Sequence, residues 1–413
     1  MVRANQVLHR IVPGLMLMVI FWGSKLFLKE LIPYMLEHSA QDHSRRRRLI
    51  LLYKSFFTLQ VSLTTALYLA IYFNRFHSHP NSRAQAASIQ NILNRSIIYQ
   101  AADARGSPLR CTICKHQIIP VRGRHCLDCG RCVYGFDHHC VWFAQCITIT
   151  GTLKPFVQVL VLGTGTILTG VIPAIPVVAQ HLQRVIALTW SAGSTGDTLR
   201  RIWWTRWWGW AGGPVYRYVG GIVLGYIYYP EIKLRHPTPP PPADQENWGN
   251  KTRKSILNEP RLSALILVVA ATMILLVMVA MLAIVVKNNI LNGLSTLEIE
   301  RARQSHRWSR DDAGITLWVP PRDGQHDSGK VVRVPPGIPI FDHGPWANFC
   351  LIMGDQVWHW FGLAGSLDNP DSLLPINPQQ LRNSCFTPQL KDFAHQDNYT
   401  PQAAHAMLNQ TNL

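Results

Sequence analysis

Long apolar stretches dominate the pattern of hydrophobic and polar positions along this chain. Residues 262–286 form 25 consecutive positions without a charge, more than the roughly 20 residues that a helix needs to cross a bilayer. Residues 49–73 and 156–179 are also long enough. Residues 11–27 form a weaker candidate because residues 23–25 interrupt it, and we expect an uncleaved anchor rather than a signal peptide. The pattern predicts about four transmembrane helices.

A further apolar segment at residues 202–229 differs in composition. It contains a cluster of tryptophans followed by a Gly- and Tyr-rich run, and Arg206 and Arg217 interrupt it. Trp, Tyr and Arg together are typical of the membrane–water interface. We expect an interfacial helix or a re-entrant hairpin here rather than another crossing. The proline-rich residues 237–242 predict a stiff, extended linker.

The composition agrees with a lipid-facing protein. Charged residues make up 15% and hydrophobic residues 47% of the 413 positions, whereas soluble domains average about 25% charged residues. The net charge of +17 suits nucleic acid, but it equally suits anionic headgroups and phosphorylated cofactors. The positive-inside rule does not fix the orientation, because basic stretches at 45–48 and 75–154 lie on either side of a single predicted helix.

Seven of the nine cysteines lie between Cys111 and Cys146. A tight cluster of cysteines mixed with histidines is typical of metal binding in a reducing compartment, so we expect this region to face the cytosol. Two closed zinc sites would use eight ligands and leave three candidates over for chemistry. The candidates are Cys111, Cys114, Cys126, Cys129, Cys132, Cys140, Cys146, His116, His125, His138 and His139. A purely structural zinc module remains an alternative.

The ordered run from Pro120 through His125, Asp137-His138-His139-Cys140 and Trp142 to Cys146 resembles the cysteine-rich domain of the DHHC family of protein palmitoyltransferases. Residues 295–298 resemble the family's Thr-Thr-x-Glu motif, and residues 341–354 resemble its C-terminal segment. The sequence departs from the family pattern at Ile119, Ala144, Gln145 and Thr148, and Arg105-Gly-Ser-Pro108 stands where the family has Asp-Pro-Gly. None of these departures removes a zinc ligand or a catalytic group.

The resemblance implies one zinc site made of Cys111, Cys114, His125 and Cys132, and an interleaved second site made of Cys126, Cys129, His139 and Cys146. Asp137, His138 and Cys140 are then left for catalysis. A thiol near neutral pH needs a base to become a nucleophile. We therefore expect Cys140 to be the nucleophile, His138 its base and Asp137 the group that orients His138.

Several other residues have weaker assignments. His116 is expected to be a solvated loop residue, and Thr296 and Glu298 either cap a helix or support the active site. Asn348 and Phe349 are expected to dock the tail, and Cys350 to be packed or itself acylated. For Arg122, Arg124 and Arg131 two roles stay open, namely contact with coenzyme A phosphates or lipid headgroups, or a solvated surface.

Together these features predict an α-helical polytopic membrane protein with a small cytosolic two-zinc domain. The implied function is protein S-palmitoyltransferase in an endomembrane such as the endoplasmic reticulum or Golgi, using palmitoyl-CoA, membrane lipid and substrate proteins, with no nucleic acid. The rivals are a membrane-anchored zinc scaffold or ubiquitin-ligase adaptor, and a transporter, which the uncharged helices disfavour. The expected segments are 1–73 with two spans, 74–155 as the DHHC zinc domain, 156–179 as a span, 180–261 as a loop, 262–286 as a span and 287–413 as a cytosolic tail.

Overall fold

The computed structural model describes residues 2–33, 43–77, 98–103, 105–114, 118–149, 151–190, 196–198, 200–201, 213–235, 261–308, 314–320, 329–336 and 338–362. The chain divides into two compact units. The first comprises Met1–Leu15, Ala66–Val161 and Ala280–Leu413, and the second comprises Met16–Thr65 and Leu162–Val279. Each of the long helices has residues in both units.

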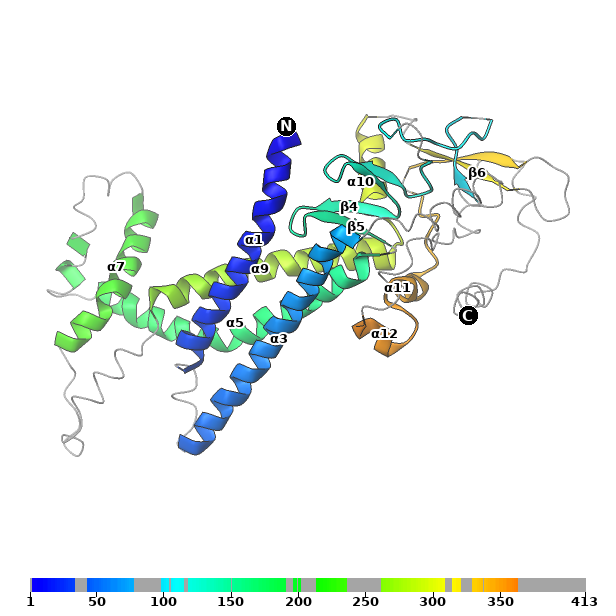
Figure 1. The fold of residues 1–413 in the computed structure, drawn as a ribbon. Coiled ribbons are helices and arrows are strands. Elements are labelled where there is room, and N and C mark those ends of the chain that lie inside the picture. The colour runs from blue at the N-terminus through cyan, green and yellow to red at the C-terminus, as the bar shows by residue number, and fades with distance from the viewer. Residues whose placement is uncertain are drawn as a thin grey trace. The chain divides into compact units, whose positions relative to one another are not determined.

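Among the residues that the structure describes, four helical segments are long and apolar enough to cross a membrane, which confirms the prediction of about four such helices. They are Ile11–Leu31, Arg47–Phe73, Leu153–Trp190 and Leu262–Leu291. The corresponding elements are α1 (Val2–Leu26) with the π-helical turn η1 (Phe27–Leu31), α3 (His43–His77), α5 (Leu153–Trp190), and α9 (Leu262–Val285) with the π-helical turn η3 (Val286–Leu291). Figure 1 shows these helices as the longest in the chain.

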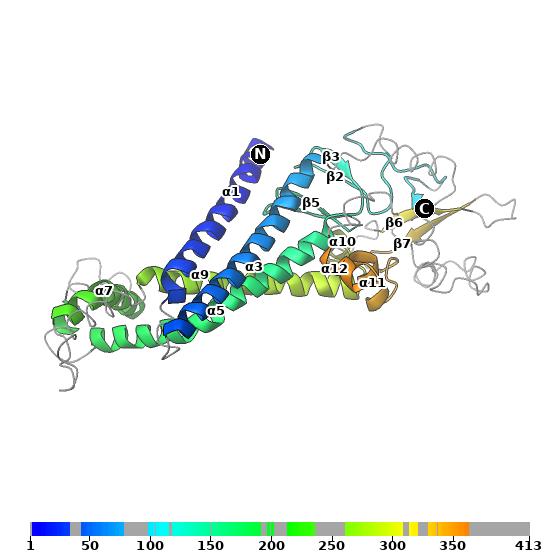
Figure 2. The same cartoon turned by 60° about the horizontal axis from the view of Figure 1, so that its bottom comes forward.

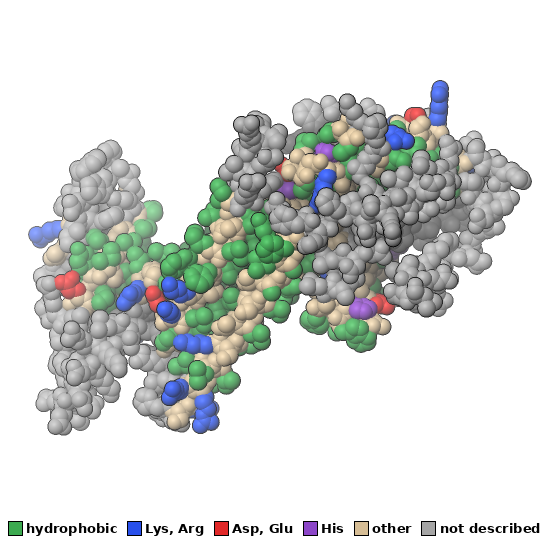
Figure 3. Space-filling view, viewed as in Figure 1, with side chains coloured by type: hydrophobic (Ala, Val, Ile, Leu, Met, Phe, Trp, Pro, Cys, Tyr) green, Lys and Arg blue, Asp and Glu red, His purple; other side chains and the backbone are tan. Residues whose placement is uncertain are grey.

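These helices carry large apolar side chains on their surfaces. Leu52 and Leu59 on α3 are 67% and 66% exposed, and Met273 and Leu276 on α9 are 60% and 59% exposed. The hydrophobic side chains are visible along the helices in Figure 3. Such an exposed apolar surface is unusual for a protein in water but is expected where lipid is the solvent.

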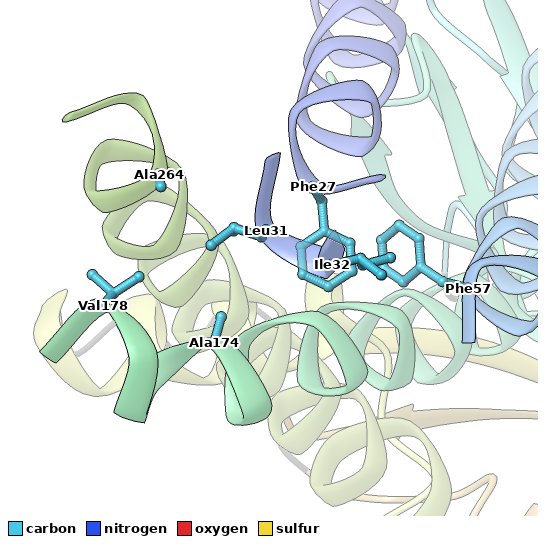
Figure 4. Packing of buried hydrophobic residues seen from close by; sticks show 7 residues of the cluster. All are labelled: Phe27, Leu31, Ile32, Phe57, Ala174, Val178 and Ala264. Atoms are coloured by element: carbon cyan, nitrogen blue, oxygen red, sulfur yellow. The ribbon is translucent and has the colours of Figure 1, made fainter. Parts of the chain in front are cut away.

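The core of the second unit gathers residues from η1, α3, α5 and α9 (Figure 4). The rings of Phe27 and Phe57 lie 4.5 Å apart, and Ala174 and Ala264 are buried between the helices. Small residues allow helix backbones to approach closely in a membrane protein. A hydrogen bond of 2.8 Å from Ser263 Oγ to Glu30 Oε2 adds a polar link between α9 and η1.

Helix α7 (Gly213–Arg235) packs against the second half of α5. A Cβ atom at Gly225 would lie 2.5 Å from Thr189 Oγ1 and 2.6 Å from Val185 Cγ1, so the contact requires glycine. The tryptophan cluster of residues 203–210 and the proline-rich linker of residues 237–242 lie outside the described residues. The prediction of an interfacial or re-entrant segment therefore stays a prediction.

The described part of the first unit contains three small antiparallel sheets. Strand β2 (Arg124–Cys126) pairs with β3 (Arg131–Val133), and β4 (Phe136–Cys140) pairs with β5 (Gln145–Thr148). The third sheet has the order β1 (Tyr99–Gln100), β6 (Ile315–Val319) and β7 (Lys330–Val334). Figure 2 shows β2, β3 and β5 beside helix α10 (Thr296–Trp308).

The third sheet ties the C-terminal region to the segment that precedes the cysteines. The ring of Trp318 on β6 stacks on Tyr99 of β1 with centroids 5.1 Å apart, and both side chains are buried. The sequence predicts only a tail at residues 287–413, and strands β6 and β7 within it were not predicted. Helix α11 (Pro345–Met353) packs against η3 at the end of the last long helix.

Candidate active site and metal clusters

The first metal cluster combines a cysteine pair with one β-hairpin. Cys111 and Cys114 come from a turn, while His125 and Cys132 are direct partners in the β2–β3 ladder. Cys114 Sγ lies 3.3 Å from His125 Nδ1, Cys111 Sγ lies 3.6 Å from the same nitrogen, and Cys132 Sγ lies 3.9 Å from Cys114 Sγ. The four ligand atoms therefore converge on one point.

The second cluster interleaves with the first along the chain. Cys126 and Cys129 come from the end of β2 and the turn after it, and His139 and Cys146 are partners in the β4–β5 ladder. Distances from His139 Nδ1 to the thiol sulfurs are 3.5 Å for Cys126, 3.4 Å for Cys129 and 3.7 Å for Cys146. The structure thus brings together both sets of four residues that the resemblance implied.

Both clusters fit a tetrahedral zinc ion. With Zn–S of about 2.3 Å and Zn–N of about 2.0–2.1 Å, the edges of a tetrahedron are about 3.8 Å between sulfurs and about 3.6 Å from sulfur to nitrogen. The observed separations, from 3.3 to 3.9 Å, lie around these values. The described cysteines are all free thiols rather than disulfides. Donor set and spacing therefore suit two structural zinc sites.

Strand β4, which carries the Asp137–Cys140 motif, contains a β-bulge. The register shifts between Phe136 and His138, so Asp137 is the extra residue of the strand. Bulges re-aim side chains and are common beside active sites. Here the bulge allows two adjacent residues to meet, and Asp137 Oδ2 lies 2.7 Å from His138 Nδ1. The Cys140 side chain also acts on the imidazole of His138 and raises its pKa. Asp137, His138 and Cys140 therefore interact as one group.

The carboxylate of Asp137 is fixed by groups from beyond the cysteine-rich region. Its side chain is 1% exposed and accepts hydrogen bonds from Thr296 N at 2.8 Å, Thr296 Oγ1 at 2.9 Å and Asn289 Nδ2 at 3.0 Å. Burial by itself would raise the pKa of Asp137, but the hydrogen bonds, with that of His138 foremost, lower it below its ordinary value. Asp137 is thus held as a carboxylate.

The imidazole of His138 is held in place by aromatic rings as well as by Asp137. The ring of Phe156 lies edge-on at 5.9 Å, and Phe143 packs on Phe156 at 5.6 Å. Burial disfavours the imidazolium, yet the interactions with Asp137 and Cys140 outweigh it and raise the pKa of His138 to about 9. His138 is therefore a stronger base than a free imidazole and is suited to accept the thiol proton of Cys140.

Glu298 has a structural role that the sequence left open. It completes a capping box at the start of α10, because Ser295 N donates to Glu298 Oε2 at 2.8 Å and Glu298 N donates to Ser295 Oγ at 3.2 Å. Its carboxylate also accepts two hydrogen bonds from the Arg122 guanidinium, from Nε to Oε1 at 2.9 Å and from Nη2 to Oε2 at 2.6 Å. The helix that carries Thr296 is thereby fixed to the zinc-binding region.

The open assignment of Arg122 to a phosphate-binding or solvated position was wrong. Its side chain is 6% exposed, and the guanidinium lies 3.8 Å from the ring centroid of Phe341 as well as on Glu298. Arg124 is exposed on β2, with its guanidinium 6.0 Å from the Phe136 ring. The earlier alternatives for Arg124 and Arg131 remain predictions, and His116 lies outside the described residues.

The C-terminal motif residues form a small folded segment. Asn348 is buried, donates to Asp342 Oδ1 at 2.8 Å and accepts from His343 N at 3.0 Å. Phe349 stacks on Trp346 with centroids 5.6 Å apart, and Cys350 on the same helix is half-buried. The sequence reading missed Asn289, whose only signal is a polar residue just beyond a long apolar run.

Comparison with known proteins agrees with this geometry. The DHHC palmitoyltransferase family profile matches residues 106–207. Palmitoyltransferase spe-10 of Caenorhabditis elegans is 34% identical over 80 residues, which cover 18% of this chain and 22% of that protein. Protein S-acyltransferase 10 of Arabidopsis thaliana is 56% identical over 39 residues, 9% and 11% of the two chains. Palmitoyltransferase swf1 of Schizosaccharomyces pombe is 45% identical over 40 residues, 10% and 11% of the two chains.

The residues that the family profile matches include both metal clusters and the Asp137–Cys140 motif. The chain spans 22% or less of the length of these three relatives. Residues 106–207 of the chain therefore contain a domain of the DHHC palmitoyltransferase family.

Proposed function

We propose that this chain is a membrane-bound protein S-palmitoyltransferase. It takes a long-chain acyl group from acyl-CoA onto Cys140 and passes it to cysteine thiols of substrate proteins at the membrane surface. The observation that carries this proposal is the hydrogen bond between Asp137 and His138, on a strand where His138 and Cys140 project from the same face. The same order of carboxylate, imidazole and nucleophile activates thiols and hydroxyls in unrelated acyl-transfer enzymes.

In the first step, His138 takes the proton of the Cys140 thiol and the thiolate attacks the carbonyl carbon of the acyl-CoA thioester. The carbon–sulfur bond to coenzyme A breaks, and the departing thiolate receives the proton from His138. In the second step, His138 takes the proton of a substrate cysteine, whose thiolate attacks the acyl-Cys140 thioester. The bond from the carbonyl carbon to the Cys140 sulfur breaks, and Cys140 takes the proton back from His138. Asp137 keeps the imidazole oriented throughout.

The metal clusters support this chemistry by position. His139 and Cys146 are ladder partners of adjacent strands, so a bound zinc would fix the backbone on both sides of Cys140. Zinc at such a closed four-ligand site supplies folding stability, and no ligand position stays open for a substrate.

The membrane location suits the donor. Each buried methylene of an acyl chain contributes about 0.8 kcal/mol, so a long chain is held best in contact with lipid or apolar helices. We place the zinc-binding region in the cytosol because thiolate ligands stay reduced there, in an endomembrane such as the endoplasmic reticulum or Golgi.

Labelling with an alkyne analogue of palmitoyl-CoA tests the proposal. The purified protein should acquire a hydroxylamine-sensitive label on the peptide that contains Cys140 and pass it to a peptide thiol. Replacing the base (His138→Ala) should slow acylation about 10²- to 10⁴-fold, the usual range for a lost general base. If the chain is instead a zinc scaffold, Cys140 stays unlabelled while both zinc sites remain filled.

A further inference from the structure

Gln145 lies directly across the β4–β5 ladder from Cys140. Opposed residues of an antiparallel pair project from the same face of the sheet, with Cβ atoms about 4.5–5.5 Å apart. By the same register Ile147 opposes His138, whereas His139 opposes Cys146 on the face that forms the metal cluster. The side chain of Gln145 therefore leaves the strand on the same face as the nucleophile and its base.

The amide group of Gln145 is buried and its donor is unused. Gln145 is 2% exposed, and Nε2 makes no hydrogen bond to any residue that the structure describes. Leaving a buried donor unpaired costs about 1–3 kcal/mol, and most buried polar groups in native proteins avoid this cost. A donor kept unpaired beside a nucleophile is suited to a substrate acceptor.

We propose that Gln145 Nε2 donates a hydrogen bond to the carbonyl oxygen of the acyl thioester and to the oxyanion that forms when Cys140 attacks. This inference rests on the acyltransferase function proposed above. As the Cys140 sulfur bonds to the carbonyl carbon, the second electron pair of the C=O bond moves to oxygen. When that pair returns, the bond to the coenzyme A sulfur breaks and the coenzyme A thiolate takes the proton held by His138.

The competing role for the same donor is stabilisation of the Cys140 thiolate before attack. The two roles differ in the reactions that they accelerate. Alkylation of Cys140 by iodoacetamide requires the thiolate but forms no oxyanion, whereas acylation requires both. An oxyanion donor therefore affects acylation alone, and a thiolate donor affects both reactions.

The test compares these two rates in the full-length protein and in a Gln145→Met variant, which keeps a similar length and removes the donor. Loss of one oxyanion donor usually lowers the rate about 10²- to 10³-fold. We expect single-turnover acylation by palmitoyl-CoA to fall by that factor. The palmitoyl-CoA concentration that gives half-maximal rate should stay within about threefold of that of the native chain, because substrate binding is not lost. The rate of alkylation by iodoacetamide should stay within about twofold of the native rate, because thiolate formation is not lost.

Two further variants control for folding. Gln158→Met removes a buried amide on α5 whose Nε2 donates to Trp360 O at 2.7 Å, so it tests the general cost of losing a buried glutamine and should leave acylation unchanged. If Gln145→Met loses zinc, Gln145→Glu keeps the side-chain shape and replaces the donor by an acceptor, and it should slow acylation at least as much.

Three outcomes would overturn the inference. The first is a Gln145→Met variant that acylates at the rate of the native chain, and the second is one whose acylation and alkylation rates fall together. In both cases the acyltransferase proposal stands and only the role of Gln145 fails. If the native chain itself forms no thioester at Cys140, the proposed function fails and this inference fails with it.

Discussion

The buried pair of Arg122 and Glu298 should hold α10, and with it Thr296, against the zinc-binding region. The two side chains are 6% and 18% exposed and are joined by two hydrogen bonds of 2.9 and 2.6 Å. Removing one partner of a buried pair costs about 3–5 kcal/mol because the other charge stays buried without compensation. Replacing both by apolar residues avoids that cost.

The two single substitutions should differ in size. Glu298→Met leaves the Arg122 guanidinium with the carbonyl of Gly293 as its remaining acceptor among the described residues, so we expect the full cost of about 3–5 kcal/mol. Arg122→Met leaves Glu298 still accepting from Ser295 N, so its cost should be smaller. In the double variant the loss should be at least about 2 kcal/mol less than the sum of the single losses.

Hydrogen exchange of backbone amides in the first turn of α10 measures the free energy of local opening for each variant. Glu300→Met is the matched control, because Glu300 lies on the same helix but is exposed, and its effect should stay within about 0.5 kcal/mol. Losses that simply add in the double variant, or a neutral Glu298→Met, would refute the reasoning.

Three further predictions follow from the packing and the metal clusters. A strong zinc chelator should release two zinc ions per chain and speed the hydrogen exchange of backbone amides in β2–β5. Strands β6 and β7 carry no zinc ligand, so their amides should stay protected. Equal loss of protection in both regions would contradict this. Thr296→Val removes the hydroxyl that donates to Asp137 and should slow acylation about 10- to 100-fold with zinc retained. The size follows because a hydrogen bond to a charged group contributes about 1.5–3 kcal/mol. An unchanged acylation rate would contradict a role of Thr296 in supporting the active site. Gly225→Ala places a Cβ 2.5 Å from Thr189 Oγ1 and should destabilise the packing of α7 on α5 by about 1–3 kcal/mol. Gly165→Ala, which has open space around the new Cβ, should leave this packing unchanged. Hydrogen exchange of the α7 amides measures both effects.

The parts of the site that the sequence could predict are those whose signals are local. Cysteine pairs spaced for a metal knuckle, such as Cys111 and Cys114, predicted metal binding, and the division into two ligand sets followed from the resemblance to the DHHC family. Membrane helices were also predictable, because an uncharged run of sufficient length has few other uses. The ends of the helices were harder to predict from the sequence. Helix α5, for example, continues to Trp190, beyond the predicted limit of residue 179.

What the sequence could not supply are contacts between distant segments. Asn289 lies 152 positions from Asp137, and Glu298 lies 176 positions from Arg122, so neither pairing has a local pattern. The bulge at Asp137 was hidden for a different reason, because the extra residue is defined only relative to the partner strand. Strands β6 and β7 do alternate apolar and polar residues in part, and closer attention to that period would have found them.

The central claim is that the motif contains two kinds of residue, with His139 binding metal and Cys140 carrying the acyl group. Measuring zinc content and thioester formation together in Cys140→Ser and His139→Ala tests it most directly. Cys140→Ser should retain two zinc ions per chain and form no hydroxylamine-sensitive acyl adduct, and His139→Ala should lose one zinc ion together with acylation. Loss of zinc from Cys140→Ser, or a persistent hydroxylamine-sensitive adduct on it, would contradict the account.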